Sequence, residues 1–293
     1  MFEKAFRSLK DLVVPDDCEV SCVISDNDPE KSAELTFEAL KNEISFPCHY
    51  FSEVEIGIVP NRNRLLVEAT RQGATYVAFF DDDEIVDPNW IVELYRAART
   101  FNAEAVWGKT IYSLPKAHAD WLEKRNFYGG DQPVTGTRRR GASTNNVLID
   151  LGFLNRFQLK FDFRFNDIGG SDSFLFRELK DHGGKVIACR EAITYEEVPE
   201  SRATEEWILR RAYKNSHTEY RRALLRRGSF AAVSLALSYG LWLYLSHMIS
   251  LFLYPFKGYD FKVYNRRREA KVIGLIDAVK GKTHREYDVV HGN

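Results

Sequence analysis

The sequence has few cysteines, and its four among 293 residues are Cys18, Cys22, Cys48 and Cys189. Their spacing matches neither a metal-binding pair nor a dense disulfide framework, so we expect a protein of a reducing compartment. The first residues, MFEKAFRSLKD, are charged and mixed, and this pattern predicts no secretory signal peptide. The chain also lacks a phosphate-binding glycine loop and a nucleophile motif, which disfavours a metal-dependent phosphatase or nucleotidyltransferase.

Net charge is nearly absent, yet the charges are unevenly distributed. The formal net charge is −1, whereas residues 201–293 carry 17 Lys and Arg against 8 Asp and Glu. The first 200 residues are therefore acidic, which argues against a nucleic-acid partner, because such a protein keeps its cations on the folded domain. Basic residues beside an apolar segment instead predict contact with an anionic membrane surface.

Apolar and aromatic residues are plentiful, at 44% and 13% of the chain. This content excludes a mainly disordered protein and suffices for one large domain or two modest ones. Strand-like runs at 19–25, 48–54, 76–80 and 146–150 alternate with helix-like runs at 29–42, 60–72, 90–99 and 168–181. Two short strands are expected at 185–188 and 192–195, and a long helix after Thr204. The rhythm predicts an α/β fold with a mostly parallel sheet flanked by helices, and ligands at the carboxyl ends of its strands.

Four acidic residues follow the apolar run at 76–80, in the order Asp81, Asp82, Asp83 and Glu84. Carboxylates side by side repel one another and lose hydration when buried, and a divalent cation removes that repulsion. Asp81 and Asp83 point to the same side, and Mg²⁺ or Mn²⁺ needs few protein carboxylates when phosphate oxygens complete its coordination. The alternative is a solvated acidic turn without a metal.

Four blocks lie in a fixed order along the chain: VISDNDPEKSA (23–33), GIVPNRNRLL (57–66), YVAFFDDDEIVDPNW (76–90) and GGSDSFLFREL (169–179). With these blocks the sequence resembles the family 2 glycosyltransferases of the GT-A (Rossmann-like) fold. It is most similar to the branch that builds bacterial exopolysaccharides of the succinoglycan type. The resemblance implies an inverting transfer of a hexose from a nucleotide sugar, expected to be UDP-linked, to a glycan on a polyprenyl diphosphate.

The resemblance also implies roles for individual residues. Asp172 would be the general base that takes the proton of the acceptor hydroxyl. Nucleotide binding falls to Asp26, Asn27, Arg62, Asp81 and Asp82, and metal binding to Asp83, Asp81 and Glu196. Without the resemblance, Asp172 reads as a helix N-cap residue and Glu196 as a surface glutamate at a strand end.

Acceptor binding is implied for Asn145, Arg202, Trp207, Arg210 and Arg211. Arginine grips phosphate in a planar fork, and tryptophan stacks on the face of a sugar. The alternative for the last four residues is an ordinary solvated amphipathic helix.

A rival hypothesis is a catalytically silent relative that binds and assembles a partner at the membrane. Two departures from the family pattern motivate it. The chain begins after the position of the family's first nucleotide-binding strand, and Ser171 stands where family members usually carry Glu.

Residues 229–256 contain no Asp, Glu, Lys or Arg and are long enough to cross a bilayer. Ser234, Ser238, Ser246 and Ser250 recur at multiples of four, so one helix stripe can pack against protein while the other faces lipid. Basic residues on both flanks favour an in-plane or re-entrant anchor at the cytoplasmic face of the membrane. A buried pair of core helices is the alternative.

The expected organisation is a glycosyltransferase domain at 1–217, which lacks the family's first strand. A basic and hydrophobic helical anchor follows at 218–260, and a basic tail at 261–293.

Overall fold

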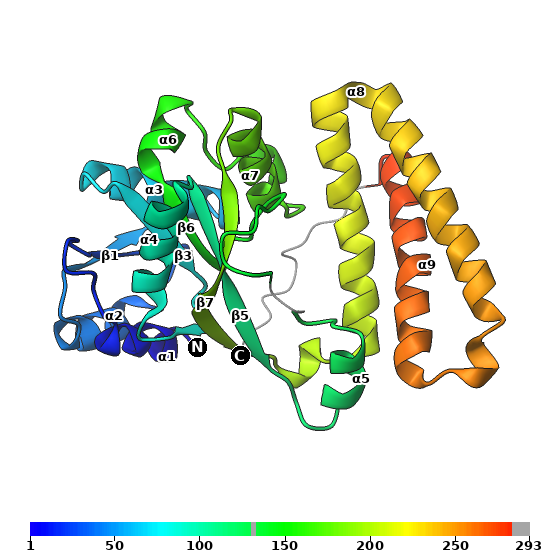
Figure 1. Ribbon diagram of the computed structural model, residues 1–293, viewed down its shortest axis with the longest axis horizontal. Coiled ribbons are helices and arrows are strands. Elements are labelled where there is room, and N and C mark those ends of the chain that lie inside the picture. The colour runs from blue at the N-terminus through cyan, green and yellow to red at the C-terminus, as the bar shows by residue number, and fades with distance from the viewer. Residues whose placement is uncertain (130–132, 283–293) are drawn as a thin grey trace. The chain divides into compact units, whose positions relative to one another are not determined.

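A computed structural model describes residues 1–129 and 133–282 (Figure 1). The chain divides into two compact units. The first comprises Met1–Ser113, Asp131–Asn166 and Ser171–Glu197, and the second comprises Leu114–Gly130, Asp167–Gly170 and Val198–Asn293.

The first unit combines strands with flanking helices. Its strands are β1 (Cys22–Asp26), β2 (Cys48–Ser52), β3 (Tyr76–Phe80), β4 (Glu84–Val86), β5 (Ala105–Ser113), β6 (Asn146–Asp150) and β7 (Val186–Glu197). Its α-helices are α1 (Phe2–Ser8), α2 (Glu34–Leu40), α3 (Ile58–Arg71), α4 (Trp90–Phe101), α6 (Leu151–Arg156) and α7 (Ser171–Asp181). Short 3₁₀ turns occur at η1 (Leu9–Asp11), η2 (Lys41–Glu43) and η3 (Phe163–Phe165). The expected α/β class is confirmed.

The strand directions differ from the mostly parallel sheet that the sequence predicts. Five strands form one sheet in the order β3-β6-β5-β7-β4, while β1 and β2 form a separate parallel pair. In the larger sheet, β5 and β7 run parallel, and the other pairings are antiparallel. An antiparallel neighbour needs no crossover helix on the sheet face. The short runs expected at 185–188 and 192–195 are one continuous strand, β7.

The core of the first unit lies on both faces of the five-stranded sheet, because successive side chains of a strand point to opposite faces. Ala105 packs with apolar residues of α3, α6 and α7, whereas the next residue, Val106, packs with those of α1, α2 and α4. These helices fix the strand ends where the polar residues lie.

The second unit is helical. It contains α5 (Ala119–Lys124), η4 (Glu200–Arg202), α8 (Glu205–Leu251), η5 (Tyr254–Phe256) and α9 (Tyr259–Val279). Thr204 caps α8 as expected, since its hydroxyl accepts from the backbone N–H of Trp207 at 3.2 Å. Gly228 leaves the helical conformation (φ 78°, ψ 172°), the chain reverses direction there, and in the view of Figure 1 α9 lies between the two halves of α8. Residues 261–279 of the expected basic tail belong to α9, and the tail's end lies outside the described residues.

Close helix packing holds the second unit together. Gly274 of α9 lies so near the backbone of α8 that a Cβ there would stand 2.5 Å from the carbonyl oxygen of Tyr213. Ala236 and Leu243 of α8 bury against Leu275 of α9. Among the described helices, α8 is the one long and apolar enough to cross a membrane, and 17% of its most apolar window is buried. A helix of this length and hydropathy in the core of a soluble protein would be mostly buried, unlike α8.

Candidate active site

The site begins at the carboxyl end of β3, where Asp81, Asp82 and Asp83 form the turn into β4. The backbone N–H of Glu84 closes this turn by donating to the carbonyl oxygen of Asp81 at 3.1 Å. Asp82 is exposed, whereas Asp81 and Asp83 are partly buried. Asp82 is thus the most accessible of the three, and a shared side for Asp81 and Asp83 stays a prediction.

Asp172 lies within electrostatic range of this turn. The pKa of Asp81 is raised to about 6, mainly by loss of hydration; the charge of Arg62 opposes this rise, and the charges of Asp83, Asp82 and Asp172 add to it. Three carboxylates and one guanidinium thus act on the carboxyl group of Asp81.

Arg62 of α3 connects the turn with the beginning of α7. Its guanidinium donates to the hydroxyl of Ser171 at 3.4 Å and lies 5.7 Å from the centre of the Phe161 ring. Asp172, the second residue of α7, accepts from the backbone N–H of Ser173 at 2.6 Å. Ser171 thus occupies the place next to Asp172 with a hydroxyl that is engaged by Arg62.

Glu84 is a site residue that the sequence analysis did not single out. It is fully buried, and burial followed by the charge of Asp81 raises the pKa of its carboxyl to about 8. Its Oε1 accepts from Asn145 at 2.8 Å and from Thr110 at 3.3 Å, while its Oε2 lies 3.4 Å from the backbone N of Asp81. Glu84 therefore supports the acidic turn from behind. Its position directly after Asp81, Asp82 and Asp83 is the feature of the sequence that could have identified it.

Asn145 is part of this support. Besides Glu84, its amide donates to the hydroxyl of Thr110 at 2.8 Å, and its carbonyl oxygen accepts from Ser143. Three bonds within the protein hold a side chain for which the sequence predicts acceptor binding. That role stays a prediction.

Asp26 and Asn27, expected at the nucleobase, both organise the loop after β1. Asp26 is buried and accepts from the backbone of Asp28 at 2.9 Å, the backbone of Ala33 at 3.1 Å and the Tyr50 hydroxyl at 2.6 Å. Asn27 bonds to the backbone of the β2–α3 loop at Glu53, Glu55 and Gly57. Their nucleotide contacts remain a prediction.

Glu196 lies opposite Glu84 in the antiparallel pairing of β4 with β7. Its charge contributes to the raised pKa of Glu84. The strand pairing thus brings it near the acidic turn, and metal binding by Glu196 stays a prediction.

The remaining acceptor candidates belong to the second unit. The Trp207 ring stacks on Tyr128 at 5.5 Å, and the Arg211 guanidinium lies 5.0 Å from the Trp207 ring centre. Arg210 pairs with Glu206 at 2.7 Å, and the carbonyl oxygen of Arg202 accepts from the Tyr128 hydroxyl. The structure places these four residues together on η4 and the first turns of α8. Their role toward an acceptor stays a prediction.

The acidic turn has the chemistry of a shared cation site. Among the described residues, no group of three His, Cys, Asp or Glu side chains is arranged to hold a metal by itself. Mg²⁺ and Mn²⁺ nonetheless bind through one or two carboxylates plus substrate phosphates. Asp81 and Asp83 supply two oxygen donors whose mutual repulsion a cation would relieve, so they fit such an ion.

Comparison with known proteins decides the family. The model of "Glycosyl transferase family 2" matches residues 1–163. The chain belongs to glycosyltransferase family 2. The succinoglycan biosynthesis protein ExoM of Rhizobium meliloti (strain 1021) is 28% identical over 218 residues, which cover 74% of this chain and 70% of that protein.

Solved structures agree on the fold. S. aureus TarS 1–349 in complex with UDP-GlcNAc is 12% identical with a TM-score of 0.50, over 99% of this chain and 91% of that one. S. aureus TarS is 13% identical with a TM-score of 0.50, over 99% of this chain and 55% of that one. At this identity the likeness concerns the fold alone. The expected resemblance to a family 2 glycosyltransferase of the exopolysaccharide type is confirmed.

Proposed function

We propose that this glycosyltransferase moves a hexose from a UDP-linked sugar to a hydroxyl of a lipid-linked glycan during synthesis of a bacterial surface polysaccharide. The observation that carries the proposal is the contact of Arg62 with Ser171, the neighbour of Asp172, at 3.4 Å, together with the charges of Arg62 and Asp172 that act on Asp81 in the acidic turn after β3. The succinoglycan biosynthesis protein supports the polysaccharide product, and the UDP-GlcNAc complex of a chain with the same fold is consistent with the donor.

The chemistry is a single displacement with inversion. Asp172 takes the proton of the acceptor hydroxyl while that oxygen forms its bond to the anomeric carbon. The bond from the anomeric carbon to the diphosphate breaks on the opposite face of the sugar, and its electron pair leaves with UDP. Asp172 lies on α7, outside the acidic turn. The base and the diphosphate leaving group can therefore occupy different positions.

Arg62 and the acidic turn share the work of binding the diphosphate. The guanidinium of Arg62 places a positive charge beside Asp81. When bound to Asp81 and Asp83, Mg²⁺ or Mn²⁺ would supply a Lewis acid that stabilises negative charge on the diphosphate. Glu84 holds the turn in shape through its contact with the backbone of Asp81.

The second half of α8 is proposed to rest on the cytoplasmic face of a membrane. Large apolar side chains of this half and of the turn after it are exposed in the described structure, among them Phe230, Leu237, Leu241, Trp242, Leu245, Ile249, Phe252 and Phe256. Arg226 and Arg227 precede this stretch and Lys257 follows it, as suits an anionic lipid surface. A membrane-bound enzyme meets a lipid-linked acceptor at high local concentration.

Binding and turnover together separate this enzyme from a silent relative. Thermal unfolding of the purified chain should shift upward when UDP and Mn²⁺ are added together, and less with either alone. Purified chain with UDP-hexoses and Mn²⁺ should release UDP slowly by hydrolysis even without acceptor. A chain that shows neither the shift nor hydrolysis of any tested nucleotide sugar would be the silent assembly subunit.

A further inference from the structure

A polar cavity lies at the end of the sheet opposite the acidic turn. Strands β3 and β5 begin at this end and β6 stops there, because β6 runs antiparallel to both. The cavity measures about 360 Å³, within the size range of small-molecule sites, and is lined by Tyr76, Ala98, Arg99, Asn102, Ala103, Glu104 and Asp150. Tyr76 begins β3 and Asp81 follows its end, so the length of one strand separates the two sites.

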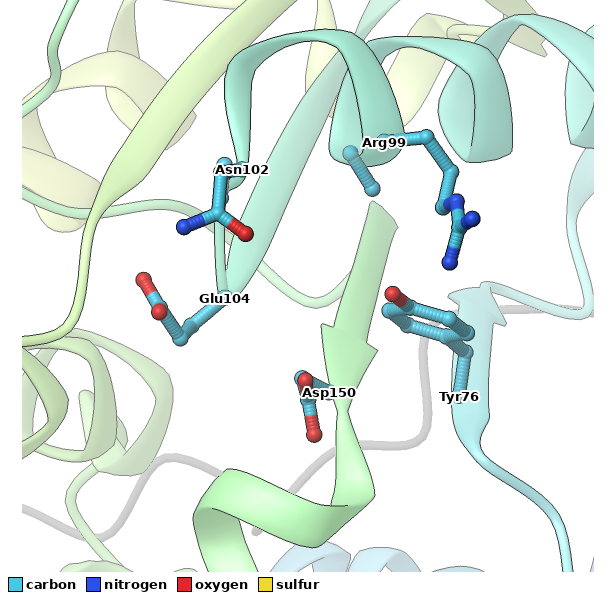
Figure 2. A pocket seen from close by; sticks show the side chains of 7 residues that line it. Tyr76, Arg99, Asn102, Glu104 and Asp150 are labelled. Carbon is cyan, nitrogen blue, oxygen red and sulfur yellow. The ribbon is translucent and has the colours of Figure 1, made fainter.

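The polar side chains of this cavity surround a common space. Figure 2 shows Arg99 and Asn102 at the end of α4, with Glu104 and Asp150 across the space and the Tyr76 ring at its border. Five of the seven lining residues carry polar side chains, which favours a polar ligand over an apolar one.

The two carboxylates are fixed by the backbone. Glu104 Oε2 accepts from the backbone N–H of Lys185 at 2.6 Å, and Asp150 Oδ1 accepts from that of Phe153 at 2.8 Å. Each carboxylate keeps a second oxygen as a hydrogen-bond acceptor. Fixed acceptors of this kind lose little conformational freedom when a ligand binds.

The mixed charge of the lining accommodates a neutral ligand. An anion would be repelled by Glu104, Asp150 and the carbonyl end of the α4 dipole, whereas a cation would be attracted by these groups and repelled by Arg99. A neutral ligand with several hydroxyls suits both the carboxylates and Arg99, because each hydroxyl can donate to a carboxylate and accept from a guanidinium, an amide or a phenol.

We infer that this cavity is a second carbohydrate site, which holds hexose units of a glycan away from the reacting hydroxyl. The choice of a glycan rests on the proposed function, since a polysaccharide-building enzyme meets chains of linked sugars. The site would keep a long acceptor or product on the enzyme between transfers. A short acceptor cannot reach from the acidic turn to the cavity, so its rate of transfer is independent of the cavity.

Asn102→Gly is the variant that tests this inference. Asn102 has a left-handed backbone (φ 45°, ψ 63°), which glycine adopts at least as well, so the amide is removed without strain. Tyr76→Phe removes one hydroxyl and keeps the ring. Arg96→Ala, exposed on the same helix outside the cavity, is the matched control.

Saturation-transfer NMR of the full chain with cellotetraose and lactose, in saturating UDP and Mn²⁺, measures the binding. We expect binding of at least one of these probes, weakened about five-fold by Asn102→Gly and by Tyr76→Phe, as for one lost hydrogen bond, and unchanged in Arg96→Ala. No binding of either probe, or equal binding by all variants, would overturn the inference. If neither oligosaccharide binds, whereas spermidine binds and Asn102→Gly weakens that binding, the inference is overturned and the cavity is a cation site.

Nucleotide-sugar hydrolysis tests the proposed function separately from the second carbohydrate site. The Asn102→Gly chain should hydrolyse UDP-hexose as fast as the natural chain. If no variant hydrolyses a nucleotide sugar while oligosaccharide binding still depends on Asn102, the proposed function fails and the second site stands.

Discussion

The side-chain amide of Asn145 donates a 2.8 Å hydrogen bond to Oε1 of Glu84, a carboxyl group with no exposure to solvent. Through this contact, a residue just before β6 stabilises the residue that ends the acidic turn. Glu84 lies too deep to contact a substrate directly. Its effect on catalysis passes through the position of Asp81, whose backbone N–H faces Glu84 Oε2.

Glu84 should make the stability of the metal-free chain fall as pH rises. Its pKa is about 8 in the folded chain, against an ordinary value of 4.5. Between these pH values the folded chain retains a proton that the unfolded chain loses, so the free energy of unfolding decreases with pH. Glu84→Gln removes this loss, and its stability relative to the natural chain should increase from pH 5 to pH 9.

Urea unfolding with a chelator at pH 5, 7 and 9 measures this difference. Glu19→Gln is the control, because Glu19 is exposed. A Glu84→Gln difference that stays constant with pH would show that Glu84 is not protonated in the folded chain.

Tyr50→Phe should destabilise the first unit. The Tyr50 hydroxyl donates to Asp26 at 2.6 Å, and burial together with Asp26 raises its pKa. A hydrogen bond to a charged group contributes about 1.5–3 kcal/mol, so the free energy of unfolding should drop by roughly that amount. Tyr195→Phe, which loses a long 3.5 Å bond at an exposed site, should change it by less than about 0.5 kcal/mol. Equal effects of the two variants would contradict a special role for the Tyr50 bond.

Asp83→Asn should abolish the metal dependence of UDP binding. Calorimetric titration of the natural chain with UDP should give an affinity at least about ten-fold higher in Mn²⁺ than in chelator, as a shared cation predicts. The variant should bind equally weakly in both, whereas Asp16→Asn, at an exposed position, should behave like the natural chain. If UDP binding by Asp83→Asn still depends on Mn²⁺, the cation does not bind at this turn.

The exposed apolar stretch of α8 should bind anionic vesicles. The natural chain is expected to float with phosphatidylglycerol-containing vesicles in a density gradient and to remain below neutral ones. Leu245→Glu combined with Ile249→Glu places two charges on this face and should prevent flotation. Ile273→Glu, on the exposed side of α9, is the control. Flotation of the double variant, or none by the natural chain, would contradict membrane contact through α8.

Local sequence patterns predicted much of the fold. Strands β3 and β6 have the predicted limits, because each is a short apolar run bounded by polar residues. Strand β5 was not predicted, since AVWGKTIYS mixes small, charged and aromatic residues. The strand directions also differed, because pairing between distant segments sets them and no local pattern records it.

The sequence supplied candidate residues for the site, whose roles stay predictions, but it did not reveal their contacts. The acidic block and Asp172 were recognised by motif, and the structure brings them together. Burial of Glu84 depends on Asn145 and Thr110, which lie far along the chain, so the sequence could not reveal it. The stack of Trp207 on Tyr128 joins residues that are distant in sequence in the same way.

Asp172→Asn tests the central claim most directly, namely that one carboxylate outside the acidic turn removes the acceptor proton. The variant should lower the rate of sugar transfer by about 10²–10⁴-fold while leaving the affinity for UDP and Mn²⁺ unchanged. Asp181→Asn, at the other end of α7, is the matched control and should transfer normally. Undiminished transfer by Asp172→Asn, with the sugar still inverted in the product, would contradict the account.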